Sequence, residues 1–558
     1  MKVLKFGGSS VANAQNIELV LKIVAEKAKT SKLIVVVSAL SGITDMLINT
    51  AAKAAAKDLS YKDNLVEIKD KHSEAIQLLL HKKDELFLNS INSQINQLET
   101  LLDGCFLLGE LSPRTSDAIL SFGESLSSQI IAKALKQKLE NSNFKDSREL
   151  IKTNSDFGKG IVDFKLTNHL IDNFFQSNKD QVVLMPGFIA SSKDDNTTTL
   201  GRGGSDYTAA ILANGVNAEL LEIWTDVSGM YTANPRIVHQ AQPIAMISYQ
   251  EAMELSHFGA KVLYPPTIQP VLEKNIPILI KNTFEPESEG TMISALVKSN
   301  DNPIKGISHI DKIALLTLEG SGMVGVSGSS KRLFEVLSKE NINVIFITQA
   351  SSEHSICIGI LNSEAEKAKV AIDSAFEIDI IQNKITPSIV EKNLCIVALV
   401  GENMKNHQGI SGKMFSTLGK NNVNIRAIAQ GASERNISVV INERDVKKAL
   451  NTLHERFFED NNKQLNLFVM GAGNVGEKFL DQIHSQKKYL KEYLKINVRV
   501  IAISNSRKMH FDDNGISLKN WKEVLEEGEV ADKDLFISQV IKLNLRNSIF
   551  IDITANAN

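Results

Sequence analysis

The sequence of 558 residues contains little cysteine, no long apolar run and no marked excess of charge of one sign. Its three cysteines are far apart and odd in number, which argues against a disulfide framework and against a CxxC metal site. No apolar run approaches the roughly 18 residues of a membrane span. Met1 leads directly into a strand-like segment, without the basic start and apolar stretch of a secretion signal. We therefore expect a cytoplasmic protein without a membrane partner.

The charges of the chain nearly balance. Sixty-two Lys and Arg against 65 Asp and Glu give a net charge of −3, so no overall field favours nucleic acid. A composition of 43% hydrophobic and 23% charged residues is ordinary for a folded protein and excludes wholesale disorder. At roughly 150 residues per domain, the length predicts three to four domains. A multidomain enzyme fits these numbers better than a single small binding module.

Strand and helix patterns alternate over about the first 295 residues. Residues 46–140 are helical in character, and the apolar runs 3–6, 33–37, 181–189, 219–224 and 276–280 are expected to form buried strands. Such alternation is typical of a parallel α/β sheet that helices cover on both faces.

The middle of the chain contains an internal repeat with an offset of 81 residues. Matching pairs at this offset include Gly320 with Gly401, Gly328 with Gly409, Asn341 with Asn422, and Gln349 with Gln430. Each copy reads as strand, glycine turn, helix, strand, polar turn, strand and helix. Two copies indicate a tandem pair of small α+β modules, because a solenoid needs three or more repeats.

A third unit is expected to begin near Leu465. An apolar strand leads into the GxGxxG turn of Gly471, Gly473 and Gly476, a helical pattern follows, and further strands are expected at 498–503 and 549–553. The space is enough for only part of a six-stranded dinucleotide fold, so this unit is expected to be incomplete. The second strand lacks the Asp or Glu that favours NAD, and Arg507 suits a 2′-phosphate, so we favour NADP and keep NAD open.

Two glycine-rich turns in the first segment suit anions. In the first, Lys5 stands before Gly7 and Gly8 and an expected helix, where backbone N–H groups and an ammonium favour a phosphate. The second is the run Gly201-Arg202-Gly203-Gly204-Ser205-Asp206. Its glycines admit close approach of an anion, its guanidinium can grip a carboxylate or phosphate, and its carboxylate can support Mg²⁺.

Three further segments are expected to follow buried strands, where open α/β sheets bind their ligands. They are residues 38–45, 123–125 and 224–236. Together with the two glycine-rich turns they form the constellation expected of a kinase for a small carboxylate.

The ordered motifs KFGGSSV, VVSALSGITD, FGES, PGFIA, TTTLGRGGSD, WTDVSGMYTANPR and SYQEAMELSHFGAKVLYPPT resemble aspartokinases of the amino-acid-kinase family over residues 1–295. Within 296–464, the repeat, at about 306–385 and 391–464, resembles paired ACT regulatory domains. Residues 465–558 resemble the start of homoserine dehydrogenase. The whole is similar to the bifunctional, threonine-sensitive aspartokinase/homoserine dehydrogenase family, truncated in its last part. The implied fold is an amino-acid-kinase-type α/β/α sandwich, tandem ACT-like modules and an incomplete Rossmann NAD(P)-binding unit.

The resemblance implies roles for the motif residues. Lys5 and Asp206 would be catalytic, with Asp206 orienting Lys5 or supporting Mg²⁺. The aspartate site would comprise Ser38, Thr44, Glu124, Arg202 and Ser205. The ATP site would comprise Gly7, Gly8, Ser9, Ser10, Gly203, Gly204, Thr225, Asp226, Tyr231, Arg236 and Lys261. The dinucleotide would be bound by Gly471, Gly473, Gly476 and Arg507, and an amino-acid effector, threonine rather than lysine, by Gln349 and Gln430.

Two departures from the family pattern flank the expected nucleotide site. Asn234 stands where an Asp is common, and Tyr264-Pro265-Pro266 replaces a usual HPR-like stretch. We expect them to affect nucleotide affinity or local loop shape more than the reaction.

The sequence is also compatible with two other functions. A kinase for another carboxylate such as glutamate and a non-catalytic amino-acid sensor are alternatives to aspartate phosphorylation. The repeat modules are expected to form a homo-oligomer through their edge strands.

Overall fold

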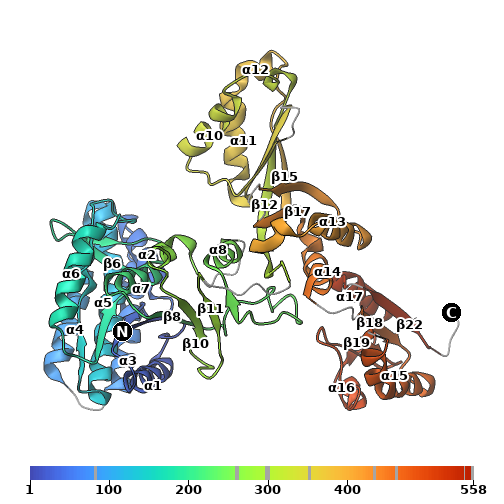
Figure 1. Cartoon of the computed structure of the whole chain (residues 1–558), viewed down its shortest axis with the longest axis horizontal. Coiled ribbons are helices and arrows are strands. Elements are labelled where there is room, and N and C mark those ends of the chain that lie inside the picture. The colour runs from blue at the N-terminus through green and yellow to red at the C-terminus, as the bar shows by residue number, and fades with distance from the viewer. Residues whose placement is uncertain are drawn as a thin grey trace. The chain divides into compact units, whose positions relative to one another are not determined.

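The computed structural model folds into two compact units (Figure 1). Unit 1 contains Met1–Met230 and Pro243–Ser299, and unit 2 contains Tyr231–Gln242 and Asn300–Asn558. The structure describes residues 1–80, 84–257, 263–295, 302–349, 354–431, 435–458, 463–494, 496–545 and 547–554. Within these ranges, none of the helices combines the length and the apolar character that crossing a membrane requires. The division into three domains stays a prediction.

Unit 1 is built on an eight-stranded sheet with the order β3-β5-β2-β1-β8-β10-β11-β9. Its strands are β1 (Lys2–Phe6), β2 (Leu33–Val37), β3 (Ser142–Phe144), β5 (Val182–Pro186), β8 (Leu220–Thr225), β9 (Met246–Ile247), β10 (Ile278–Asn282) and β11 (Thr291–Ile293). The six strands from β3 to β10 run parallel, which confirms the predicted parallel sheet. A second sheet contains β4 (Lys152–Thr153), β6 (Ile189–Ser192) and β7 (Thr197–Thr199).

Helices cover both faces of the large sheet. One face carries α1 (Ala14–Ala28), α2 (Ile43–Ala55), α3 (Tyr61–Leu79), α4 (Glu85–Leu108) and α5 (Pro113–Lys138). The other elements of unit 1 are α6 (Phe164–Ser177), α7 (Gly204–Gly215), α8 (Tyr249–His257) and α9 (Gln269–Glu273). Because α7 packs on β1, β2 and β8 and contacts α6 and α9, it covers the opposite face. The predicted α/β/α sandwich is confirmed.

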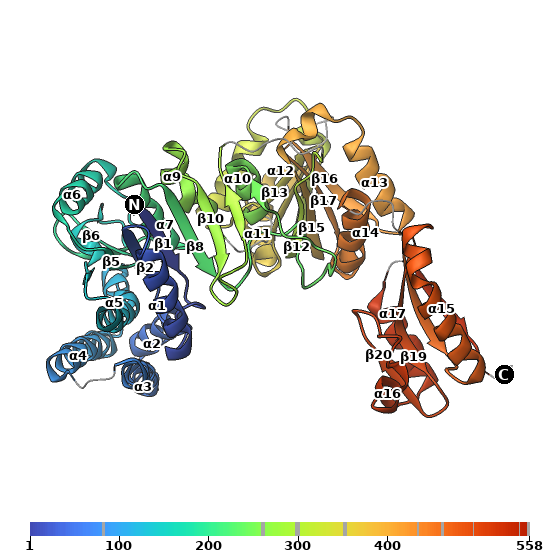
Figure 2. The same cartoon turned by 60° about the horizontal axis from the view of Figure 1, so that its bottom comes forward.

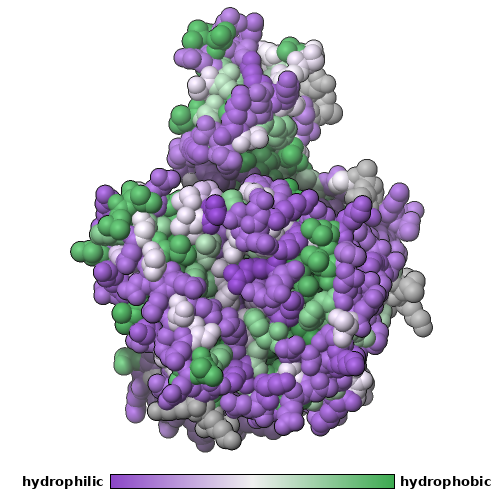
Figure 3. All heavy atoms as spheres, turned by 90° about the vertical axis from the view of Figure 1, so that its left-hand side faces the viewer, coloured by the Kyte–Doolittle hydropathy of each residue, from purple (hydrophilic) through white to green (hydrophobic). Residues whose placement is uncertain are grey.

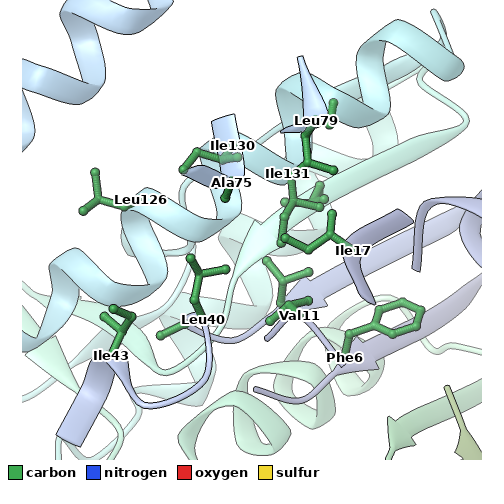
Figure 4. Close-up of a cluster of buried hydrophobic side chains, with 14 of the residues drawn as sticks. Phe6, Val11, Ile17, Leu40, Ile43, Ala75, Leu79, Leu126, Ile130 and Ile131 are labelled. Carbon is green, nitrogen blue, oxygen red and sulfur yellow. The ribbon is translucent and has the colours of Figure 1, made fainter. Parts of the chain in front are cut away.

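The alternation of side chains along β1 determines on which face of the sheet the candidate site lies. Leu4 and Phe6 are fully buried in the apolar cluster beneath α1 and α5. Figure 4 shows part of this cluster, with Phe6 near Val11 and Ile17. Lys5, between them, points to the opposite face because successive side chains of a strand alternate. It therefore lies on the face that α7 covers.

Three expectations for unit 1 are wrong in detail. Residues 123–125 lie inside the 26-residue helix α5 and do not follow a strand. The helix after the first glycine turn begins only at Ala14, capped by Asn13, so Gly7 and Gly8 are not at its mouth. The run 181–189 is broken at Gly187 and Phe188, and its last residue starts β6 in the second sheet.

Hydrophilic residues predominate on the face of unit 1 seen in Figure 3, and apolar residues form small separate groups.

Unit 2 contains the repeat as one six-stranded sheet with the order β13-β14-β12-β15-β17-β16. The first copy contributes β12 (Gly306–Glu319), β13 (Phe346–Gln349), β14 (Ser355–Leu361), α10 (Ser329–Lys339), α11 (Ala365–Ala375) and α12 (Glu377–Ile381). The second contributes β15 (Ile389–Val400), β16 (Ile425–Gln430), β17 (Asn436–Asn442), α13 (Ile410–Lys420) and α14 (Val446–Phe458). The long strands β12 and β15 pair with each other and join the copies, as Figure 2 shows.

The repeat is confirmed in the backbone. Gly328 and Gly409 precede α10 and α13 in the left-handed conformation, at φ of 100° and 80°. Asn341 and Asn422 adopt φ of 55° and 54° after the same helices. The 81-residue repeat in the sequence therefore coincides with a repeat of positive φ angles, which glycine and asparagine tolerate better than other residues.

The C-terminal part of unit 2 is a five-stranded sheet with the order β21-β20-β19-β18-β22. Its elements are β18 (Lys463–Met470), β19 (Ile496–Ser504), β20 (Lys508–Phe511), β21 (Glu529–Val530), β22 (Ser548–Asp552), α15 (Asn474–Glu492), α16 (Trp521–Glu526) and α17 (Lys533–Leu543). The three predicted strands are present, and β18 pairs parallel with both β19 and β22.

Candidate active site

The predicted catalytic pair meets inside unit 1. The Lys5 Nζ atom lies 2.7 Å from Asp206 Oδ1, and the two side chains are only 11% and 13% exposed. Lys5 comes from β1 and Asp206 from the first turn of α7, so two segments 200 residues apart are joined at one end of the sheet. A nearly buried ammonium held by a single carboxylate is suited to stabilise charge that develops on a reacting group.

The second glycine-rich turn is tightly packed at the start of α7. A Cβ atom on Gly204 would lie 2.6 Å from Phe188 Cδ2, and one on Gly187 would lie 2.6 Å from Ser205 Cβ. Only glycine at both positions allows the turn to approach the strand connection so closely. The turn thus holds Arg202 at the surface, with its guanidinium 5.5 Å from the centre of the Tyr264 ring.

Glu124 supplies a buried carboxyl group from the middle of α5. Its side chain is 4% exposed, and its Oε2 atom has no hydrogen-bond partner in the described part of the chain. Burial raises its pKa from 4.5 to about 8, although a backbone hydrogen bond from Ala39 acts in the opposite direction. A buried carboxyl with a free oxygen is ready to accept a donor from a ligand.

One cavity of about 680 Å³ connects these groups. Nine of the predicted site residues line it, namely Lys5, Ser38, Thr44, Glu124, Arg202, Gly203, Gly204, Ser205 and Asp206. Lys5 and Arg202 therefore line the same cavity, which places an ammonium and a guanidinium around one space. The positive charge of Lys5 and Arg202 suits a ligand with negative charge, and Glu124 Oε2 can accept a hydrogen bond from such a ligand.

The first glycine turn lies outside the lining of this cavity. Gly7 N–H donates to the carbonyl of Trp224, and Gly8 and Ser9 are half-buried. The Ser10 hydroxyl is fully buried. It donates to the Trp224 carbonyl in β8 and lies 2.7 Å from Thr283 Oγ1, just after β10, so it fixes the turn to these two strands.

The remaining residues predicted for the nucleotide are divided between the units. Thr225 is the last residue of β8 and Asp226 follows it, exposed, in unit 1, whereas Tyr231 and Arg236 belong to unit 2. Lys261 lies outside the described residues.

The segment Tyr231–Gln242 packs on the second repeat module. Val238 is fully buried in the apolar cluster of that module. Thr232 Oγ1 lies 2.8 Å from His454 Nε2 on α14, and Ile307 N–H donates to the Thr232 carbonyl. The segment that carries Tyr231 and Arg236 is therefore fixed to a predicted regulatory module.

The two departures from the family pattern have local explanations. The side-chain oxygen of Asn234 accepts a hydrogen bond from Arg236 N–H, which an aspartate at this position could equally accept. Tyr264, at the start of the second departure, stacks beneath Arg202. Pro266 is exposed in the same segment. The second departure therefore contacts Arg202, the residue expected to bind the substrate carboxylate.

The predicted effector residues occupy equivalent positions in the two modules. Gln349 ends β13 and Gln430 ends β16, and both are exposed. The Gln430 amide oxygen accepts from the Ser411 hydroxyl at 2.9 Å. Although β13 and β16 stand at opposite ends of the strand order, some of their Cα atoms lie within 8 Å, so the two edges approach each other.

The GxGxxG turn lies between β18 and α15. Gly471 has a φ of 103°, and a Cβ on Gly476 would lie 2.2 Å from the Gly471 carbonyl oxygen. Gly473 stands at the N-cap of α15, and Arg507 is exposed just beyond β19. This is a tight turn before a long helix, as a pyrophosphate site requires.

The sequence reasoning missed several cavity residues, among them Asp117 and Phe188. Asp117 precedes Glu124 by seven positions on α5, and that spacing on one helix face was an available signal. Phe188 lines the cavity with a φ of 66°, which is rare for a bulky residue. Its motif PGFIA contributed to the resemblance, but the residue carried no separate signal.

Comparisons with known proteins agree with this architecture. The amino acid kinase family model matches residues 1–282, and an ACT domain model matches 316–376 and 397–457. The chain is 38% identical to bifunctional aspartokinase/homoserine dehydrogenase 1 of Arabidopsis thaliana, covering 100% of this chain and 62% of that protein. The corresponding Haemophilus influenzae enzyme is 36% identical, covering 100% and 68%.

A solved structure is also similar. Escherichia coli aspartokinase III in complex with aspartate and ADP superposes with a TM-score of 0.69 at 29% identity, over 82% of this chain and 100% of that one. The chain thus spans less than two thirds of the Arabidopsis relative but all of the shorter bacterial kinase. From the family match over residues 1–282 and the site geometry, the chain belongs to the amino acid kinase family, with a pair of ACT domains after its kinase domain.

Proposed function

We propose that the chain is an aspartate kinase that transfers the γ-phosphoryl group of ATP to the β-carboxylate of L-aspartate, yielding 4-phospho-L-aspartate. The observation that carries this proposal is the convergence on one cavity of Lys5, Arg202 and Glu124, whose Oε2 atom has no hydrogen-bond partner among the described residues. The similarity to a bifunctional aspartokinase/homoserine dehydrogenase and to a solved aspartokinase in complex with aspartate and ADP supports aspartate and ATP as the substrates.

The chemistry requires little activation of the acceptor. An aspartate β-carboxylate has a pKa near about 3.9 in model peptides and is ionised at neutral pH, so no general base is needed. The task of the protein is to hold two anions in line and to offset their repulsion. In this proposal, Arg202 grips the α-carboxylate, Glu124 accepts from the α-ammonium group, and Ser38, Thr44 and Ser205 complete the pocket. Lys5 then faces the transferring phosphoryl group.

Asp206 has two roles in this proposal. At 2.7 Å it orients the Lys5 ammonium. It also fits a Mg²⁺ site, because Mg²⁺ is commonly held by one or two carboxylates together with substrate phosphates. Bound there, Mg²⁺ would neutralise charge on the phosphates. The described residues contain no group of three or more His, Cys, Asp or Glu that could hold a metal ion.

We also propose a second activity for the longer protein to which residues 465–558 would belong. There the dehydrogenase part would reduce aspartate semialdehyde to homoserine. The turn of Gly471, Gly473 and Gly476 fits a dinucleotide pyrophosphate, and the exposed Arg507 fits the 2′-phosphate of NADP. A bound dinucleotide would supply the hydride; these residues would only bind and orient it.

The kinase proposal is tested by a hydroxamate assay with ATP and either aspartate or glutamate. We expect aspartate to be preferred by at least about 10-fold, since one extra methylene changes binding by about 1–3 kcal/mol in a fitted pocket. Equal turnover of the two would favour the broader carboxylate kinase. No turnover of either, with retained amino-acid binding, would favour the sensor.

Feedback regulation is proposed for the ACT pair, with threonine as the effector. Threonine would inhibit by binding more tightly to a less active arrangement of the chain. Gln349→Ala and Gln430→Ala should each raise the threonine concentration for half-inhibition by about 5-fold to 10²-fold, because each removes one side-chain contact. The uninhibited rate should stay near that of the wild type.

The control for these two variants is Gln382→Ala, an exposed glutamine after α12 outside the two matching strand ends. If threonine inhibits both Gln349→Ala and Gln430→Ala as strongly as the wild type, the assignment of these residues to the effector site is refuted. If lysine inhibits the wild type and threonine does not, lysine is the effector.

A further inference from the structure

Asp117 is a buried carboxylate that the proposed reaction does not use. It lies on α5 with 1% exposure, five residues into the helix and therefore beyond the N-cap. Its Oδ2 atom accepts from Thr199 N–H and from Gly158 N–H, both at 2.9 Å. Its Oδ1 atom accepts from the Thr199 hydroxyl at 2.8 Å. Three donors thus stabilise a buried charge, and two of them belong to backbone outside the helix.

These donors belong to segments that carry the second glycine-rich turn. Thr199 is the last residue of β7, and Gly201 and Arg202 follow it. The Thr199 carbonyl in turn accepts from Gly160 N–H at 2.8 Å. A Cβ atom on Gly201 would lie 3.2 Å from the Gly158 carbonyl oxygen. The Asp117 carboxylate is therefore the point at which α5, β7 and the Gly158 loop are joined.

The same helix carries Glu124. The two residues are seven positions apart, which is about two turns and roughly 10 Å along the axis, and they share a helix face. Both line the cavity, as does Arg202. A shift of β7 relative to α5 would change the separation of Arg202 from Glu124, the two groups proposed to bind opposite ends of the amino acid.

We propose that Asp117 is a positioning residue that fixes the Arg202 turn relative to Glu124, so that the amino-acid substrate is held by its carboxylate and its ammonium group at once. The identity of that substrate rests on the proposed function. In this proposal Asp117 acts through the backbone of Thr199 and Gly158, to which it is hydrogen-bonded, and not by binding a reactant. The structural prediction is that the turn at residues 200–205 is ordered by a carboxylate on a neighbouring helix.

The test compares Asp117→Asn with Asp163→Asn. Asp163 accepts from Leu166 N–H at the start of α6 and does not line the cavity, so it controls for loss of a carboxylate that caps backbone. In Asp117→Asn one acceptor oxygen becomes an amide donor that faces N–H or O–H groups. We expect kcat/KM for aspartate to fall by about 10-fold to 10²-fold, mainly through KM, with KM for ATP within about threefold. Asp163→Asn should change neither constant.

Hydrogen exchange of the same variants provides a readout that does not depend on activity. Asp117→Asn should lose protection at Thr199 and Gly158 and through the turn at 200–205, while the amides of α5 near Glu124 stay protected. Thr199→Val should show a smaller effect of the same kind, and Thr199→Ser, which keeps the hydroxyl, should restore the wild-type constants.

The outcomes separate the two proposals. Wild-type protection of the turn in Asp117→Asn, or an equal loss of aspartate affinity in Asp163→Asn, would overturn the positioning role. If the wild-type protein does not phosphorylate aspartate, the proposed function fails, and the exchange experiment still decides whether Asp117 holds the turn.

Discussion

Replacing Lys5 with methionine is expected to lower kcat for aspartate phosphorylation by at least about 10³-fold, because single cations at the transferring phosphoryl group contribute effects of this size. Methionine keeps the length and the apolar stem of lysine and removes only the charge. The measurement is the steady-state rate of phosphoryl transfer from ATP to aspartate.

The matched control is Lys29→Met at the end of α1. That lysine is exposed and pairs with Glu26 on the surface, so its loss should leave kcat within about twofold of the wild type. A Lys5→Met variant with a kcat near that of the wild type would remove this residue from the mechanism.

Variants of Asp206 test whether Lys5 and Asp206 act as a unit. Lys5→Met leaves the Asp206 carboxylate, which is 13% exposed, without its cation, so this single variant should also be less stable. The double variant with Asp206→Asn removes both charges. It should regain stability, and if Asp206 acts only by orienting Lys5, it should be no less active than Lys5→Met alone, whereas a further loss in kcat would report the role of Asp206 at Mg²⁺. Independent, additive losses in kcat would contradict this coupling.

The sequence was sufficient to predict this meeting of Lys5 and Asp206. Lys5 is the last residue but one of a short apolar strand, and Asp206 follows a glycine cluster in the first turn of a helix. In a parallel sheet the carboxyl ends of strands share one edge, so both patterns point to the same place. The backbone pattern of the repeat was predictable for a similar reason: Gly and Asn at a fixed offset report positions with positive φ.

The sequence was insufficient where packing overrides the local pattern. The segment 121–128 of α5 is almost entirely buried although it contains serine and glutamate, because it is surrounded by α2, α4 and the sheet. A helix buried on all sides lacks the polar stripe that usually reveals a helix, so residues 123–125 were placed after a strand. A Cβ on Gly123 would lie 3.0 Å from Ala39 Cβ, which explains the glycine there.

Glu124→Gln is expected to raise KM for aspartate by about 10²-fold, because a hydrogen bond to a charged group contributes about 1.5–3 kcal/mol. The amide has the same shape and can still accept from the substrate ammonium, so the loss reports the charge. KM for ATP should change little. Glu110→Gln, at an exposed glutamate between α4 and α5, is the matched control and should leave both constants unchanged.

The protonation of Glu124 gives this prediction a pH dependence. Burial raises the pKa of Glu124 to about 8 in the free protein, so near pH 7 this carboxyl holds its proton. An ammonium group beside it favours the carboxylate, and aspartate binding should therefore release one proton. Aspartate affinity should rise with pH up to about 8 and then level off. Calorimetry in buffers of different ionisation enthalpy measures the released proton directly.

The raised pKa of Glu124 also affects the stability of the folded protein, and in the opposite direction. Because the folded-state pKa lies above the ordinary value of 4.5, the folded protein binds a proton that the unfolded chain releases between the two values. The stability that Glu124 contributes is fully present below about pH 4.5 and is lost as pH rises through about 8. The melting temperature of the wild type relative to Glu124→Gln should therefore decrease over this range, while its relative affinity for aspartate increases. A carboxyl kept buried for packing alone would produce the first trend without the second, so the opposed pH profiles identify Glu124 as the group that receives the substrate.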